Sequence, residues 1–186
     1  MDKAVLISIR LKWCEKIIRG EKTIEVRKSR PNMETPFKCY IYCTMDHHYI
    51  SVSCGELDKL NYRTNTVGRC NGKVIGEFTC DRIFTINVFD NGGIQNWFFE
   101  HMKRSCLTYE ELADYIGNGR TGHGWHISDL VIYDEPKELI EFHTWKKCKS
   151  CSKSGYESTA CIYDENCMIP AAITKAPQSW CYVEAL

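Results

Sequence analysis

The octet at residues 20–27, GEKTIEVR, constrains the fold of this chain more than any other stretch. Before it, residues 11–19 place apolar side chains at helical spacing with basic ones beside them, which predicts an amphipathic helix. Gly20 suits the left-handed turn that ends such a helix. Residues 23–27 then alternate between polar and β-branched apolar side chains, which predicts a strand. A basic helix and a strand with a charged face are therefore expected to lie side by side.

The rest of the chain is predicted to form short strands with two or three helices between them. Apolar and polar residues alternate in the strands, and a capping box at 108–111 begins one of the helices. We expect strands over residues 4–9, 38–44, 73–83, 126–133, 139–145 and 179–184, and helices over 93–102 and 108–117. Gly76, inside a strand, indicates a bulge or the close approach of another backbone. This order predicts a mixed α/β (α+β) fold with a small, strongly bent sheet or barrel.

The composition is that of one globular domain without a membrane span. The chain has 186 residues, of which 44% are hydrophobic and 26% are charged. No apolar run approaches the length that crosses a bilayer, and the N-terminus does not resemble a signal peptide, so we expect a cytoplasmic protein. The net charge is zero, but residues 1–38 hold ten basic and five acidic side chains, a net +5. Such a local excess attracts anions even when the whole chain is neutral.

The chain has twelve cysteines, which in a cytoplasmic protein are expected to be reduced thiols or metal ligands. Seven are scattered through the first 106 residues, where a buried cysteine acts as a small hydrophobe. Four lie close together as Cys148-x2-Cys151-x9-Cys161-x5-Cys167. A C-x2-C pair is typical of half of a four-thiolate zinc site, and zinc would order a segment poor in apolar residues. The alternatives are a reactive dithiol and a loop without metal.

A helix with an aromatic residue, followed by G-x-K-T-x-E-x-R at the start of a strand, resembles the ASCH family (activating signal cointegrator homology) of the PUA-like superfamily. Residues 122–142, GHGWHISDLVIYDEPKELIEF, resemble the closing strand of that family. The overall pattern is most similar to its phage- and prophage-associated branch. The resemblance implies a PUA-like β-barrel of five or six strands, with two to three flanking helices and a Cys-rich C-terminal segment.

The resemblance also implies how the chain is divided and what it binds. Residues 1–145 would form the PUA-like ASCH domain, residues 146–176 a Cys-rich insertion that holds the candidate zinc ligands, and residues 177–186 the closing strand of the ASCH domain. Ligands in the superfamily are RNA, nucleotides or modified bases. The family cleft lies between the barrel and a helix, and is lined by the Lys, Glu and Arg of the octet.

The octet supplies three candidate binding residues, Lys22, Glu25 and Arg27. Arginine offers phosphates and carboxylates a planar fork of donors, and lysine offers them a mobile point charge. Glu25 is suited to accepting a hydrogen bond from the exocyclic amine of a base, as carboxylates do from cytosine. The alternative is an ion-paired strand face in which Glu25 only neutralises its basic neighbours.

Four further side chains are candidates for the same ligand. Lys12, on the basic side of the predicted helix, would hold phosphate. Trp13 and Trp125 would stack on a base, a contact worth about 1–3 kcal/mol in single-stranded recognition. A histidine such as His126 is suited to moving protons near neutral pH. For each of the aromatic residues the alternative is a place in the core of a small barrel, and for His126 it is a structural role in a strand.

These residues suggest functions from different classes. The first is a binding protein for RNA or a modified nucleotide. The second is a hydrolase that acts on a modified nucleoside or on RNA, with Lys22 and Glu25 as its catalytic acid–base pair. Some small bacterial members of the family are similar to amidohydrolases that deacetylate N4-acetylcytidine with a Thr three residues after the Lys, but that position here is Glu25. A third is a phage-encoded interaction protein whose Cys-rich tail docks a host partner.

The cysteine cluster yields a direct test. Protein purified without chelators is expected to contain about one zinc ion per chain by elemental analysis, because four thiolates complete a tetrahedral site. Replacing Cys148 and Cys151 with serine should release the metal, whereas replacing Cys181, which lies outside the cluster, should not. A zinc content below about half an equivalent in the unmodified chain would contradict the prediction.

Overall fold

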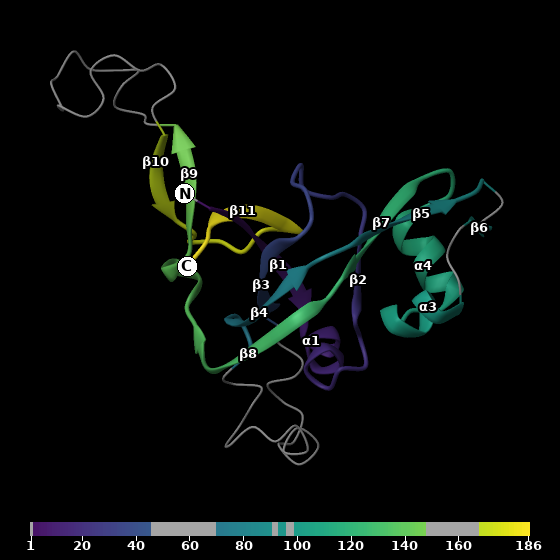
Figure 1. The fold of residues 1–186 in the computed structure, drawn as a ribbon, viewed down its shortest axis with the longest axis horizontal. Helices are drawn as coiled ribbons and strands as arrows, with labels where there is room; N and C mark the ends of the chain where they lie inside the picture. Colours follow the sequence, from purple (N-terminus) through teal and green to yellow (C-terminus); the bar gives the residue numbers. More distant parts are fainter. Residues whose placement is uncertain (1, 46–69, 91–92, 96–98, 148–167) are drawn as a thin grey trace, which may run out of the picture.

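The computed structural model describes residues 2–45, 70–90, 93–95, 99–147 and 168–186 (Figure 1). It has the mixed α/β character that the sequence predicts. The strands are β1 (Lys3–Arg10), β2 (Ile24–Arg27), β3 (Phe37–Thr44), β4 (Val74–Cys80), β5 (Ile83–Val88), β6 (Ile94–Gln95), β7 (Thr121–His126), β8 (Ser128–Lys137), β9 (His143–Lys147), β10 (Met168–Ala172) and β11 (Trp180–Glu184). The helices are α1 (Leu11–Ile18), α3 (Phe99–Ser105) and α4 (Tyr109–Ile116), with a 3-10 turn η2 (Leu139–Glu141). Within these ranges no helix is long and apolar enough to cross a membrane.

The larger sheet has five strands in the order β11-β1-β3-β4-β8. β1 runs parallel to β3, and the other neighbours are antiparallel. Every residue from Ala4 to Ile9 is buried, because both faces of β1 are covered. Ile7 and Ile9 belong to a core that also takes in residues of α1, whereas Ala4 and Leu6 belong to a second core with Phe142. This central strand therefore fixes the position of the α1 helix that follows it.

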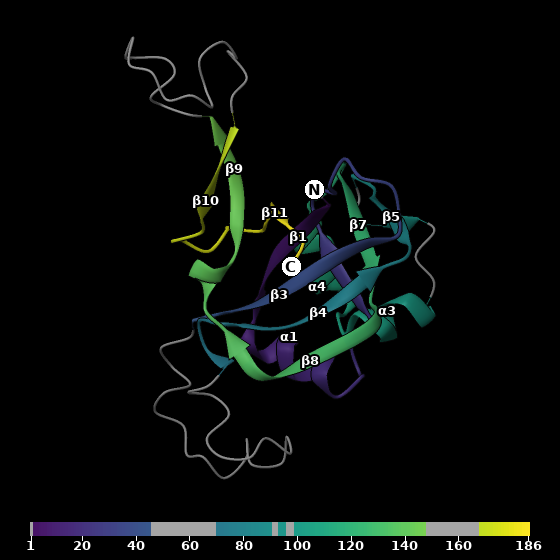
Figure 2. The same ribbon diagram turned by 60° about the vertical axis from the view of Figure 1, so that its left-hand side comes forward.

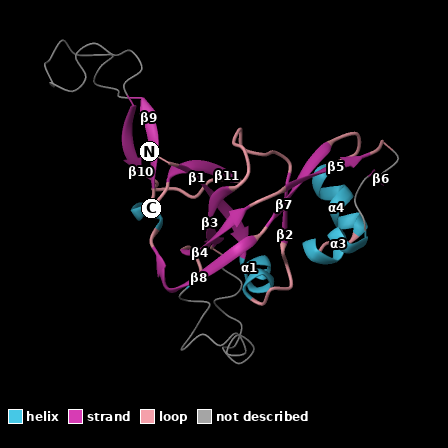
Figure 3. Ribbon diagram, viewed as in Figure 1, coloured by secondary structure: helices cyan, strands magenta, loops and turns pink. Residues whose placement is uncertain are grey.

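The smaller sheet has four strands in the order β2-β7-β5-β6, with α3 and α4 beside it (Figure 3). Ile24 and Val26 of β2 pack with Leu112 of α4 in a third core, as their alternation predicts. All four residues of β2 are buried, so its charged face does not lie on the open surface. Glu25 and Arg27 are instead covered by the larger sheet and α1.

The chain passes from one sheet to the other four times, and two of these passages are short connections between consecutive strands. β4 ends in the larger sheet, and after Asp81 and Arg82 the chain continues as β5 in the smaller one. β7 belongs to the smaller sheet, and after Ile127 the chain continues as β8 in the larger one. The prediction of one uninterrupted strand over 73–83 is therefore wrong, because two charged residues break its alternation where the chain changes sheets.

The described strands do not close into the β-barrel of five or six strands that the sequence predicts. Among them β2 pairs only with β7, so its other edge has no backbone ladder. β11 pairs with β1 as far as Trp180 opposite Ile7, and the Ser8 N–H still donates to the Ser179 carbonyl at 2.9 Å. The Ser8 carbonyl accepts a hydrogen bond of 2.6 Å from Nη2 of Arg27. A side chain thus joins β1 to β2 where no backbone ladder does, and this region is an open seam between the two sheets.

Two predicted helix boundaries are confirmed next to this seam. α1 ends at Ile18, and Gly20 has a φ of 72°, the left-handed conformation expected after a helix. The capping box at 108–111 begins α4, where Thr108 and Glu111 exchange hydrogen bonds between side chain and backbone. The turn at Gly20 brings the chain back beside α1, so that β2 starts close to the basic side of that helix.

The C-terminal part of the chain completes the larger sheet at its β11 edge. β9 and β10 form an antiparallel ribbon that projects from the body of the protein (Figure 2). The predicted strand over 139–145 is instead η2 followed by β9, because Glu138 and Glu141 form a capping box that begins a turn. The four candidate zinc ligands at 148–167 lie outside the described residues. The described cysteines are free thiols, and five of them are buried as small hydrophobes: Cys14, Cys39, Cys43, Cys70 and Cys80.

Gly76 provides a test of the packing between β4 and β8. A Cβ at this position would overlap the backbone carbonyl oxygen of Val131 on β8 and lie 3.1 Å from Cα of Ile132. Gly76→Ala is therefore expected to lower the free energy of unfolding by about 1–3 kcal/mol, as overpacking does. Equilibrium chemical denaturation measures this, with the exposed Thr85→Ala as a control expected within about 0.5 kcal/mol. Equal effects of the two substitutions would contradict the close approach.

Candidate functional site

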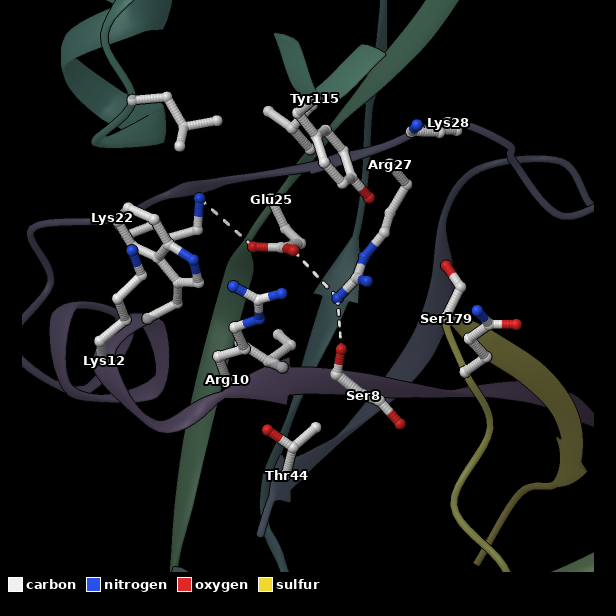
Figure 4. A pocket seen from close by; sticks show the side chains of 15 residues that line it. Ser8, Arg10, Lys12, Lys22, Glu25, Arg27, Lys28, Thr44, Tyr115 and Ser179 are labelled. Carbon is white, nitrogen blue, oxygen red and sulfur yellow. Dashed lines mark hydrogen bonds and ion pairs between the residues drawn. The ribbon is translucent and has the colours of Figure 1, made fainter. Parts of the chain in front are cut away.

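A cleft of about 800 Å³ lies at the open seam, between β1, α1 and β2 (Figure 4). Five residues predicted from the sequence line it together: Lys12, Trp13, Lys22, Glu25 and Arg27. Residues from distant parts of the chain complete the lining, among them Arg10, Lys28, Tyr115 and Ser179. Five of the lining side chains are basic and one is acidic. The cleft is therefore a strongly positive environment in a chain of zero net charge.

Glu25 lies at the floor of the cleft between two cations. Nζ of Lys22 is 3.3 Å from Oε2 of Glu25, and Nη2 of Arg27 is 3.0 Å from Oε1. Lys22 is 3% exposed, Glu25 6% and Arg27 7%. Charges this deeply buried are tolerated only when they are paired. Ion pairing of the strand face, the alternative raised from the sequence, is thus present, and the paired groups also form the wall of an open cleft.

Lys22 is held on several sides by oxygen atoms. Its Nζ donates hydrogen bonds to the carbonyls of Ile24 at 2.9 Å and Ser105 at 2.7 Å, and it also pairs with Glu25. Ser105 is the last residue of α3, so its carbonyl belongs to the negative end of that helix. Three oxygen atoms thus surround Nζ, and Lys22 is placed to hold Glu25 in position.

Glu25 and Arg27 retain unused hydrogen-bonding capacity. Arg27 donates Nη2 to the Ser8 carbonyl and to Glu25, while its Nε has no hydrogen-bond partner among the described residues. Oε2 of Glu25 is near Lys22 but likewise receives no hydrogen bond. A buried donor and a buried acceptor without partners each cost free energy, about 1–3 kcal/mol. The two atoms are thus buried polar groups whose hydrogen-bonding capacity is not met among the described residues.

The rim of the cleft carries three exposed cations, Arg10, Lys12 and Lys28. Within the described ranges none of them forms an ion pair. Two of them lie over aromatic rings: Nζ of Lys12 is 4.3 Å from the centroid of the Trp13 ring, and Nζ of Lys28 is 5.3 Å from that of Tyr115. Nζ of Lys22 is also 5.1 Å from the Trp13 centroid. The positive charge at the rim is therefore not neutralised by a neighbouring carboxylate.

Arg10, Lys28 and Tyr115 escape prediction from the sequence. Arg10 directly precedes the predicted helix and Lys28 directly follows the octet, so both positions are signals that the sequence contains. Tyr115 carries no such signal, because it reaches the cleft only through the packing of α4 against β2. Local patterns cannot reveal a contact that depends on tertiary packing.

Trp125 does not reach the cleft. It is fully buried in the core between the sheets, where its ring packs edge-on against Phe37 and at a tilt against Trp180. The reason is its register: Trp125 lies opposite Glu25 in the β2–β7 pair, and so points into the space between the two sheets. The core position, the alternative raised from the sequence, is the one observed, and Trp125 presents no face to a ligand.

His126 lies on the other face of the smaller sheet, away from the cleft. Its Nδ1 contacts Oδ1 of Asp81, and its Nε2 contacts Nη2 of Arg104. Because arginine only donates, Nε2 accepts and Nδ1 carries the proton toward Asp81. Arg104 also donates Nε to the Thr23 hydroxyl at 2.9 Å. His126 thus connects β7 to the end of α3 and to the start of β2, which is a structural role.

Comparison with known proteins identifies the fold. No protein-family model and no curated protein matches the sequence. The crystal structure of ASCH from Zymomonas mobilis is similar with a TM-score of 0.54 and 15% sequence identity, over 97% of this chain and 87% of that one. The chain has an ASCH-like fold. A serine-to-alanine mutant of the same Zymomonas mobilis protein gives a TM-score of 0.55, again at 15% identity, over 97% of this chain and 88% of that one.

The ASCH-like fold agrees with the resemblance drawn from the octet. At 15% identity the likeness extends to the fold alone, so it neither identifies a ligand nor assigns roles to residues. The phage- or prophage-associated type stays a prediction. The chemistry of the cleft therefore has to be argued from the side chains that line it.

The arrangement around Lys22 predicts that this residue is essential for stability. Lys22→Met removes the partner of Glu25 and leaves the carbonyls of Ile24 and Ser105 without their donor, so the free energy of unfolding should fall by about 3–5 kcal/mol. Lys12→Met, on the exposed rim, is the matched control and should change it by about 0.5 kcal/mol or less. Urea denaturation followed by tryptophan fluorescence measures both. A loss for Lys22→Met of only about 1 kcal/mol, as for an exposed pair, would contradict the buried role.

Proposed function

We propose that this chain is an RNA- or nucleotide-binding protein whose ligand occupies the cleft at Lys22, Glu25 and Arg27. The observation that carries the proposal is the charge of the cleft, where five basic side chains face one carboxylate. The carboxylate is already paired with two of them, which leaves Arg10, Lys12 and Lys28 to attract an anion. Phosphate groups are the anions that such lysine and arginine clusters bind in nucleotides.

Within this proposal the side chains have separate roles. The rim cations hold phosphate, because they are exposed and free to move toward it. Arg27 lines the cleft and offers its guanidinium to an acceptor on the base or the sugar. Glu25 accepts a hydrogen bond from a donor on the base, such as an exocyclic amine. Lys22 keeps Glu25 in place, because its Nζ also bonds to the carbonyl at the end of α3.

A hydrolase that acts on a modified nucleoside or on RNA is the second candidate. The observation in its favour is that Glu25 lines the cleft and that its carboxylate is held in place by Lys22 and Arg27. In such an enzyme Glu25 would act on a water molecule, and Lys22 would position it rather than act as an acid–base partner. Release of acetate from N4-acetylcytidine, or cleavage of RNA, that is lost in Glu25→Gln would favour this candidate over binding alone.

Binding of a short, fluorescently labelled oligocytidylate RNA tests the proposed function. Fluorescence anisotropy should show binding that weakens as salt rises, with a slope of log K against log salt that falls by about 0.7 for each cation removed. We expect the double variant Arg10→Ala/Lys12→Ala to bind at least tenfold more weakly. Lys103→Ala/Lys175→Ala removes the same charge from exposed positions outside the cleft, and is the matched control.

The comparison of these two variants decides the result. A loss of affinity confined to Arg10→Ala/Lys12→Ala places the ligand at the cleft. An equal loss in both variants indicates attraction to the protein surface in general, and no detectable RNA binding at low salt would contradict the proposed function. Both variants lie at the surface, so circular dichroism and thermal unfolding should be unchanged in each of them.

A further inference from the structure

The cleft has the same pair of side chains, a lysine over an aromatic ring, on each of its two sides. On one side Lys12 lies over Trp13, and on the other Lys28 lies over Tyr115. Figure 4 shows Lys12 on one side of the cleft and Lys28 with Tyr115 on the other, with Glu25 and Arg27 between them. The two pairs come from different parts of the fold, α1 on one side and the end of β2 with α4 on the other. The cleft therefore has two outer positions and one central position.

Each outer pair offers the two contacts by which proteins hold a nucleotide of a single strand. The ammonium binds a phosphate, and the aromatic face stacks on a base. In the free protein the lysine occupies the ring, which keeps the aromatic surface covered by a cation–π contact. Lys12 and Lys28 are exposed and Tyr115 is 38% exposed, so each lysine is able to move from the ring to a phosphate. Each lysine–aromatic pair is thus suited to binding one nucleotide.

The central position differs chemically from the outer two. Glu25 and Arg27 line the cleft, and Nη2 of Arg27 is 3.0 Å from Oε1 of Glu25. A carboxylate and a guanidinium are suited to hydrogen bonds with the edge of a base rather than to stacking on its face. A base that enters between the outer positions would meet an acceptor on Glu25 and a donor on Arg27. This position therefore selects the base by its hydrogen bonds, while the outer positions accept any base.

One nucleotide does not use all three positions. A nucleoside monophosphate has one base and one phosphate, so it engages either an outer pair or the central pair with a rim cation. The cleft volume of about 800 Å³ lies toward the upper end of the range for sites that bind a single small molecule. Two separate cation–aromatic pairs with a polar centre fit successive phosphates and bases of one strand.

We propose that the cleft binds a single-stranded segment of at least three nucleotides, with outer bases on Trp13 and Tyr115 and the middle base at Glu25 and Arg27. This inference rests on the proposed function, and it defines the ligand as a strand rather than a free nucleotide. Single-stranded RNA and single-stranded DNA both offer these phosphates and bases. At the sugar they differ in the 2′-hydroxyl.

The test compares a mononucleotide with a trinucleotide. Isothermal titration calorimetry is carried out on the whole protein with cytidine monophosphate, with a trinucleotide of three cytidines, and with its deoxy counterpart. We expect the trinucleotide of RNA, DNA or both to bind at least tenfold more tightly than the mononucleotide. Lys28→Ala and Tyr115→Ala should each weaken trinucleotide binding, the second by about 5- to 150-fold as expected for a lost stacking contact. Lys103→Ala is the control and should leave the affinity for both kinds of ligand unchanged.

The salt dependence separates the two outer positions. Lys12→Ala and Lys28→Ala should each reduce the salt slope for the trinucleotide by about 0.7, and the double variant by about twice that amount. For the mononucleotide, the salt slope of the double variant should fall by no more than about 0.7, because that ligand has a single phosphate. Additive losses for the trinucleotide alone support a strand that spans the cleft.

Three outcomes would overturn the inference, and they are distinguishable from failure of the proposed function. Equal affinity for the mononucleotide and both trinucleotides indicates a nucleotide site, so the strand is wrong while the proposed function stands. Tighter trinucleotide binding that Lys28→Ala and Tyr115→Ala leave unchanged also excludes a strand across both sides of the cleft. Absence of binding for all three ligands contradicts the proposed function itself, and the inference with it.

Discussion

The rest of the structure depends on the burial of one carboxylate, Glu25, between two cations. Removing three charged groups from water is costly, and pairing them recovers only part of that cost. Well-packed hydrophobic side chains in the same space often give equal or greater stability, so stability alone does not explain these buried charges. The contacts also come from distant parts of the chain, since Lys22 is held by the end of α3 and Arg27 by Ser8 of β1. The ion pairs thus join both sheets around a common centre.

The same residues lie at the opening between the two sheets, where the described strands do not close into a barrel. No backbone ladder joins β2 to β1, and the Arg27 side chain bonds instead to the Ser8 carbonyl. The opening is lined by Lys22, Glu25 and Arg27. Fold and site are therefore one feature, because the opening in the sheet is the cleft.

The sequence predicts what is local in this arrangement and misses what depends on packing. Gly20, the capping box at Thr108 and the alternation of β2 are decided by neighbouring residues, and all three are as predicted. Trp125 illustrates the limit: an aromatic residue after a glycine-rich loop suits a binding site, but its register opposite Glu25 places it between the sheets. The break at Asp81 and Arg82 is marked in the sequence by two adjacent charged residues, but the second sheet that the chain then joins is not. Tyr115 reaches the cleft only through the docking of α4, for the same reason.

The distribution of charge across the cleft narrows the kind of ligand that fits. A simple anion balances the charge of the rim but leaves the carboxylate of Glu25 without a hydrogen-bond donor from the ligand. A neutral base satisfies Glu25 and Arg27 but leaves the three rim cations without a counter-charge. Only a molecule that is anionic on the outside and offers hydrogen-bond donors on the inside satisfies both layers together. A nucleotide has this division between phosphate and base, and therefore the two layers of the cleft favour a nucleotide over either of its parts.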